Sequence, residues 1–217
     1  MSNNYKNPTK VITGPKTRWS YANVWDPKSI NGGAPKYSVS LIIPKSDVAT
    51  VKKIEAAIQA AYEEGEFKLK GNGKSVPSLK ILKTPLRDGD LERPDDAAYA
   101  DSYFINANSA SAPGIVDADR QPILERSEVY SGVYGRASIN FYAFNSNGNK
   151  GIACGLNNLQ KIADGEPLGG KASAESDFAS DEDGTGKSQS LPRLHQGCRW
   201  ESHHRSRASG GGKAHLP

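Results

Sequence analysis

The hydrophobic pattern of the first 45 residues predicts two strands. Residues 16–25 alternate, and one face of the segment carries Thr17, Trp19, Tyr21, Asn23 and Trp25. Residues 36–43 alternate in the same way, with an apolar face of Tyr37, Val39, Leu41 and Ile43. A period of two residues is typical of a half-buried strand. The Asp26-Pro27 pair and the SINGG sequence at 29–33 are turn signals between the two strands.

The pattern then changes to helical spacing. Apolar residues recur three or four positions apart, at Val48, Val51, Ile54, Ile58 and Ala61/Tyr62. Ser46 is a suitable N-cap for a helix that starts at Asp47, and Gly65 is a suitable end. The sequence therefore predicts one helix, at about 47–64.

The clearest strand covers residues 133–144. Its apolar face holds Val133, Ala137, Ile139, Phe141 and Ala143, and its other face holds Tyr134, Arg136, Ser138, Asn140, Tyr142 and Phe144. An Asn-Gly turn at 145–149 and a partner strand at 151–156 predict a hairpin. A further strand is expected at 103–108, after an acid-rich loop at 84–101. One inserted helix among about five strands indicates a mainly β fold, a small β-barrel, with a β-sandwich as the alternative.

Composition divides the 217-residue chain near residue 164. No Val, Ile or Tyr follows Ile162, and the segment is rich in Gly and Ser, so it lacks the apolar surface that folding requires. We therefore expect a folded domain at 1–164 and a disordered C-terminal tail at 165–217. Within the tail, residues 172–183 are acidic, whereas residues 184–217 are basic and atypical in composition.

The residues argue against catalysis. No histidine precedes His195, so the serines of the domain lack the usual base. The acids at 88–96 (Asp88, Asp90, Glu92, Asp95 and Asp96) raise the alternative of a metal-dependent nuclease, but a solvated loop is the preferred interpretation. Cys154 alternates with apolar neighbours and is predicted to be buried. We expect no enzyme activity, no catalytic residue, no metal and no cofactor.

The charge distribution indicates an anionic partner. The formal net charge is +4, but residues 1–83 carry 14 basic and 6 acidic residues. Aromatic rings stack on bases while cations neutralise phosphates, which suits single-stranded nucleic acid. The predicted DNA contacts are Lys16, Arg18, Tyr21, Lys36, Lys80, Lys83, Tyr134, Arg136, Tyr142 and Phe144. The alternative for the face at 134–144 is a solvated surface. Trp19 is assigned to the core, and which face of 16–25 meets DNA stays open.

Three blocks of sequence resemble a known family. They are RWSYANVWDPKSINGGAPKYSVSLIIPK (18–45), PLRDGDLERPDDAAYADSYFINANS (85–109) and VYSGVYGRASINFYAFNSNGNKGIACGLNNLQKIADGEPLGG (129–170). The family comprises bacteriophage and prophage single-stranded-DNA-binding proteins, formerly a domain of unknown function, with an OB-fold and an acidic C-terminal tail. The resemblance covers about residues 8–183, and residues 184–217 depart from the family pattern.

The resemblance implies a function and partners. The chain is expected to bind single-stranded DNA with little sequence preference and to protect it during phage replication or recombination. The tail is expected to recruit replication or recombination proteins through Glu175, Asp177, Phe178, Asp181, Glu182 and Asp183. A rival hypothesis is an accessory factor that acts mainly through protein contacts. The sequence has no apolar run long enough to predict a membrane span, so we expect the protein in the cytoplasm of the bacterial host. Its oligomeric state stays open.

Overall fold

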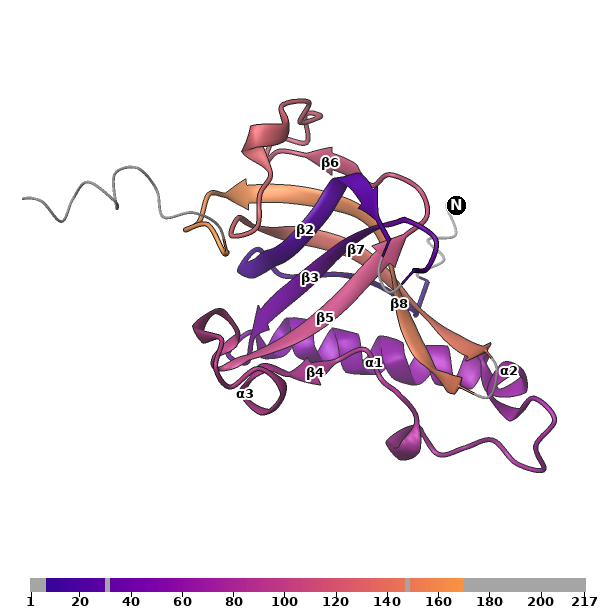
Figure 1. Ribbon diagram of the computed structural model, residues 1–217. Helices are drawn as coiled ribbons and strands as arrows, with labels where there is room; N and C mark the ends of the chain where they lie inside the picture. The colour runs from indigo at the N-terminus through magenta and orange to yellow at the C-terminus, as the bar shows by residue number, and fades with distance from the viewer. Residues whose placement is uncertain (1–6, 30–31, 147–148, 170–217) are drawn as a thin grey trace, which may run out of the picture. The chain divides into compact units, whose positions relative to one another are not determined.

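The computed structural model describes residues 7–29, 32–146 and 149–169 (Figure 1). The strands are β1 (Lys10–Ile12), β2 (Thr17–Lys28), β3 (Lys36–Pro44), β4 (Arg87–Asp88), β5 (Ser102–Ser109), β6 (Gly114–Val116), β7 (Tyr134–Ser146) and β8 (Asn149–Ala163). The helices are α1 (Val48–Glu64), α2 (Glu66–Lys70) and α3 (Gly89–Glu92), with 3₁₀ turns η1 (Leu79–Ile81), η2 (Ala97–Tyr99) and η3 (Arg126–Glu128). The predicted tail at 165–217 lies almost entirely outside the described residues, and so do all six predicted partner-binding residues.

Five long strands close into a barrel. β2 pairs with β3, β3 with β5, β5 with β8, β8 with β7, and β7 returns to β2. All of these pairs are antiparallel except β5–β8, which is parallel. The strands β1, β4 and β6 extend the barrel sheet at its margins. This closed five-stranded arrangement is an OB-fold barrel, as the resemblance implied.

The barrel interior confirms the predicted strand faces. The predicted apolar face of β7 is buried, and so is that of β3 except for Tyr37, which is half-buried. Trp19 on β2 has no exposed surface. Phe141 is also buried in this core, whereas the adjacent Tyr142 points outward with 42% of its surface exposed. A period-two pattern fixes such faces because successive side chains of a strand point to opposite sides.

The long helix α1 packs against the barrel close to where it was predicted, and Figure 1 shows it running beneath the strands. Val51, Ile54 and Ile58 are buried in the barrel core. The N-cap is Asp47 rather than Ser46, because the Asp47 side chain accepts a hydrogen bond from the Thr50 backbone N–H. Val48 was expected on the buried stripe but is exposed. Among the described residues, no helix combines the length and apolarity of a membrane span.

The acid-rich segment at 84–101 is not the simple solvated loop that the sequence predicted. It contains β4, α3 and η2, and it covers one end of the outer face of β3 and β5. Tyr99 is only 1% exposed there and packs edge-on against Phe104, with ring centroids 5.2 Å apart. The Tyr99 hydroxyl also donates a hydrogen bond to Ser40 Oγ. This segment builds a small second apolar cluster outside the barrel.

The alternation of β2 breaks at Tyr21. The sequence pattern placed Tyr21 on the face of Trp19, but Trp19 is buried and Tyr21 is 58% exposed. The pairing of β2 with β3 shifts register between Ser20 and Asn23, and Tyr21 has a left-handed φ of 46°. A bulge of this kind redirects a side chain. An aromatic residue rarely adopts this backbone conformation, which costs on the order of 1–3 kcal/mol, and such outliers concentrate at functional sites.

Candidate nucleic-acid interface

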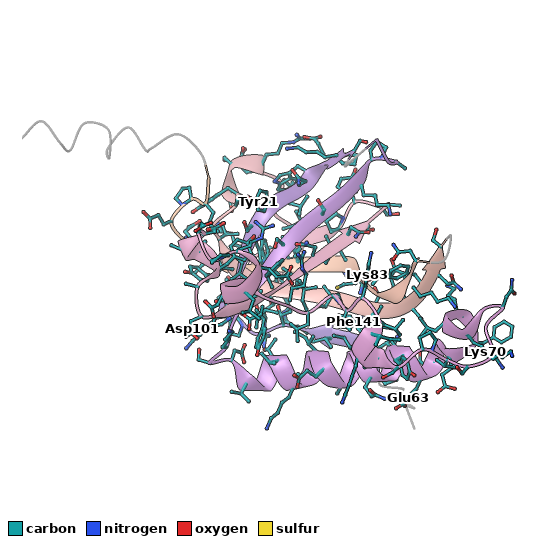
Figure 2. All side chains as sticks on the ribbon, turned by 60° about the horizontal axis from the view of Figure 1, so that its bottom comes forward. Tyr21, Glu63, Lys70, Lys83, Asp101 and Phe141 are labelled. Carbon is teal, nitrogen blue, oxygen red and sulfur yellow. The ribbon has the colours of Figure 1, made fainter. Side chains whose placement is uncertain are left out.

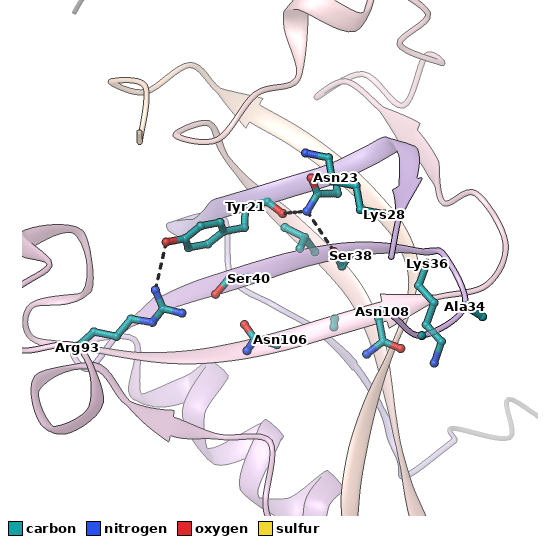
Figure 3. A pocket seen from close by; sticks show the side chains of 13 residues that line it. Tyr21, Asn23, Lys28, Ala34, Lys36, Ser38, Ser40, Arg93, Asn106 and Asn108 are labelled. Atoms are coloured by element: carbon teal, nitrogen blue, oxygen red, sulfur yellow. Dashed lines mark hydrogen bonds between the residues drawn. The ribbon is translucent and has the colours of Figure 1, made fainter. Parts of the chain in front are cut away.

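A groove crosses the outer face of β2, β3 and β5 and has a volume of about 790 Å³ (Figure 3). Its floor comes from cross-strand pairs in which Ser38 lies opposite Asn108 and Ser40 lies opposite Asn106. We call it the Tyr21 groove. Its lining consists of Tyr21, Asn23, Lys28, Gly33, Ala34, Lys36, Ser38, Val39, Ser40, Arg93, Asn106, Ala107 and Asn108.

Tyr21 and Arg93 form one end of the groove. Arg93 Nη1 donates a hydrogen bond of 3.4 Å to the Tyr21 hydroxyl, and its guanidinium carbon lies 5.3 Å from the centre of the Tyr21 ring. Figure 3 shows the hydrogen bond that joins this guanidinium to the hydroxyl end of the ring. Arg93 therefore contacts Tyr21 through a hydrogen bond at the hydroxyl and a cation–π contact, and the 58% exposure of Tyr21 leaves ring surface available for stacking.

Arg93 is itself fixed by two rings of the second apolar cluster. Its guanidinium carbon lies 4.6 Å from the centre of the Tyr99 ring and 5.3 Å from that of Phe104. Cation–π contacts of this kind orient the group while leaving it charged. The second apolar cluster thus brings the Arg93 cation to the groove. Arg93 lies 72 residues from Tyr21 in the sequence.

Lys45 ties the same segment to the barrel. Its Nζ lies 2.9 Å from Asp88 and 2.7 Å from Asp90. The hydrogen bond from Lys45, and then that from the Asp101 backbone N–H, hold the pKa of Asp90 below its usual value. The contact with Asp90, followed by that with Asp88, raises the pKa of Lys45. These acids have a structural role, because they anchor the segment that delivers Arg93.

The groove combines the groups that single-stranded nucleic acid requires. Lys28, Lys36 and Arg93 supply positive charge, and the lining includes no acidic residue. Amide and hydroxyl side chains on the floor both donate and accept hydrogen bonds, so they suit base edges of any kind. The exposed Tyr21 ring offers a stacking platform.

Only two of the ten predicted DNA contacts, Tyr21 and Lys36, line this groove. Arg18 and Tyr134 contact each other, with the guanidinium carbon 5.4 Å from the ring centre. Arg18 also donates hydrogen bonds to the carbonyl oxygens of Gly132 and Glu166. These contacts give Arg18 and Tyr134 a structural role that joins β2 to the segment after β8.

The other predicted contacts lie elsewhere on the domain. Arg136, Tyr142 and Phe144 are on the outer face of β7, and Lys16 is exposed in the turn before β2. Lys80 lies in η1, and the Lys83 carbonyl accepts a hydrogen bond from Ile152 on β8. Figure 2 separates Lys83 clearly from Tyr21. The structure therefore does not gather the ten residues on one surface, and their DNA contacts stay predictions.

Sequence reasoning missed several groove residues, including Asn23, Lys28, Arg93, Asn106 and Asn108. A signal was present for part of this set, because Asn106 and Asn108 alternate with the buried Ile105 and Ala107. Ser38 and Ser40 alternate with Val39 and Leu41 in the same way. No local pattern pointed to Arg93, which reaches the groove through tertiary packing.

The described residues hold no cluster of three or more His, Cys, Asp or Glu side chains arranged to bind a metal ion. Cys154 is buried, as predicted, and burial raises the pKa of its thiol. A buried thiol with a raised pKa is a poor nucleophile.

Comparison with known proteins finds relatives from bacteriophages. A protein from Acyrthosiphon pisum secondary endosymbiont phage 1, named putative protein p50, is 31% identical over 168 residues, which are 73% of this chain and 87% of that protein. The single-stranded DNA-binding protein of bacteriophage Enc34, solved in complex with ssDNA, is 25% identical and has a TM-score of 0.60. The match covers 74% of this chain and 90% of the Enc34 chain. The gp2.5 single-stranded DNA-binding protein of bacteriophage T7 shares the fold, with 15% sequence identity and a TM-score of 0.52. The match covers 82% of this chain and 98% of the gp2.5 chain.

A family model extends this relationship over most of the chain. The model described as "Enterobacter phage Enc34, ssDNA-binding protein" matches residues 9–187. This range contains the whole barrel, the segment that carries Arg93, and every residue of the Tyr21 groove. The chain therefore belongs to the family of the Enterobacter phage Enc34 ssDNA-binding protein.

Proposed function

We propose that this protein binds single-stranded DNA in the Tyr21 groove, with little sequence preference, and protects it during phage DNA replication or recombination. One observation carries the proposal: an exposed tyrosine, three cations and a floor of amide and hydroxyl groups line one groove without an acidic residue. Its position supports this assignment. When the barrel strands are counted from β2, β3 and β5 are the second and third. The face formed by the second and third strands of an OB-fold binds oligonucleotides.

The chemistry favours single strands over duplex. Stacking on Tyr21 and hydrogen bonding to the floor both require bases whose faces and edges are exposed, which a duplex hides. The Enc34 relative that was solved with ssDNA has the same fold and belongs to the same family, which supports this ligand.

We further propose that the protein is a binding module rather than an enzyme, acting where phage DNA is copied, in the cytoplasm of the bacterial host. The names of its relatives describe binding rather than catalysis. The carboxylates that suggested a nuclease include Asp88 and Asp90, and both of these pair with Lys45. Intact DNA after incubation with Mg²⁺ is the expected result.

Salt should weaken binding to single strands steeply. If Lys28, Lys36 and Arg93 each neutralise one phosphate, the slope of log affinity against log salt should be about −2, since each phosphate contact on a single strand contributes about −0.7. Fluorescence anisotropy with a labelled oligonucleotide at several salt concentrations measures this slope. Lys36→Gln should reduce its magnitude by about 0.7.

A duplex of the same sequence is the control for that titration, and Lys52→Gln on the exposed side of α1 is the matched control variant. Lys52→Gln should leave the slope unchanged. Equal affinity for duplex and single strand, or an affinity independent of salt, would contradict the proposed function.

A further inference from the structure

A second hollow adjoins the Tyr21 groove. It has a volume of about 510 Å³ and shares Tyr21, Asn23 and Lys28 with the Tyr21 groove. Its remaining lining comes from Ser20, Ala22, Asp96, Ala98, Ser131, Leu168 and Gly169. We call it the Asp96 hollow. The two concavities are thus neighbours, and Tyr21 belongs to the walls of both.

Tyr21 lies where these two spaces meet. The bulge in β2 and the left-handed backbone at Tyr21 turn the ring outward, and Arg93 holds its hydroxyl. Ser131 Oγ accepts a hydrogen bond from the Ala22 backbone N–H, which fixes the strand beside the bulge. Because the groove and the hollow share Tyr21, Asn23 and Lys28, a strand in the groove can continue past Tyr21 into the Asp96 hollow.

The chemistry of the Asp96 hollow differs from that of the groove. Lys28 is shared by both, and Asp96 is the one carboxylate among the lining residues. Asp96 Oδ1 accepts a hydrogen bond from the Ala98 backbone N–H and caps η2. Within the described part of the chain, no hydrogen bond to Oδ2 is present. A carboxylate repels phosphate but accepts hydrogen bonds from the exocyclic amino groups of cytosine and adenine.

We propose that the Asp96 hollow binds one nucleobase and that Asp96 favours a base with an exocyclic amino group. This inference rests on the proposed function, because it extends the path of the DNA by one site. Thymine and uracil present a carbonyl oxygen where cytosine presents its amino group, so the carboxylate disfavours them. The preference acts at one position only, and the rest of the groove stays tolerant of sequence.

The test compares oligo-dC with oligo-dU, about ten nucleotides long, a length within the site size of an OB-fold. Deoxyuridine is chosen because it lacks the thymine methyl group. The wild-type protein should bind oligo-dC more tightly, by roughly 2- to 12-fold, the range for one net hydrogen bond. Asp96→Asn should remove most of this ratio, because its amide can donate to the uracil oxygen. The amide oxygen still accepts from Ala98, so the cap of η2 is kept.

Asp95→Asn is the matched control, since it removes the same charge from the exposed neighbouring residue, which does not line the hollow. Its dC-to-dU ratio should equal that of the wild type. Equal wild-type affinity for the two oligonucleotides would overturn the proposal, and so would an Asp96→Asn variant that gains affinity for both equally. If the wild type bound neither, the proposed function itself would fail, which is a distinguishable outcome.

Discussion

Replacing Tyr21 with alanine should weaken single-stranded DNA binding by about 1–3 kcal/mol, or roughly 5- to 150-fold in affinity. The reason is the loss of the exposed ring on which a base stacks, in a groove whose cations and floor stay in place. Tyr21→Phe should retain most of the affinity, because it keeps the stacking surface and loses only the hydrogen bond from Arg93. Anisotropy titrations at one fixed salt concentration measure both variants.

Tyr142→Ala is the decisive control for this experiment. Tyr142 is an exposed tyrosine on the outer face of β7 and does not line the groove. We expect its removal to change DNA affinity much less than removal of Tyr21. The reverse result, with Tyr142→Ala impaired and Tyr21→Ala normal, would move the site to the β7 face that the sequence pattern indicated.

Replacing Phe141 with alanine should lower the free energy of unfolding by about 3–5 kcal/mol. Phe141 is 2% exposed in the barrel core, opposite Cys154 on β8, and truncation leaves a cavity that the closed barrel cannot collapse to fill. Urea denaturation measures the loss, with tryptophan fluorescence, to which the buried Trp19 contributes, as one probe.

The adjacent Tyr142→Ala variant serves here as the stability control, because its side chain points away from the core. Its free energy of unfolding should stay close to that of the wild type. If Tyr142→Ala unfolded easily and Phe141→Ala were stable, the register of β7 would be shifted by one residue, since such a slip exchanges the two faces of a strand.

The sequence determined the parts of this protein that local periodicity governs. The two faces of β7, the apolar face of β3 and the burial of Trp19 follow from alternation and side-chain size, and the structure confirms them. Helical spacing placed α1 to within a residue at its start, where Asp47 rather than Ser46 forms the cap. The strand pattern and the basic and aromatic residues indicated a small β-barrel and a single-stranded nucleic-acid partner, and the family resemblance specified an OB-fold and single-stranded DNA.

Tertiary structure alone decided where the groove lies. Alternation shows which side chains leave the core, but it cannot show which outer face becomes concave, because concavity depends on packing between distant segments. Tyr21 enters the groove through a bulge that breaks the alternation of β2, and Arg93 arrives on a segment that the sequence presented as a solvated acidic loop. Arg18 and Tyr134, two predicted DNA contacts that lie outside the groove, contact each other. Each of these outcomes rests on contacts between residues far apart in the chain, and a local pattern carries no information about such contacts.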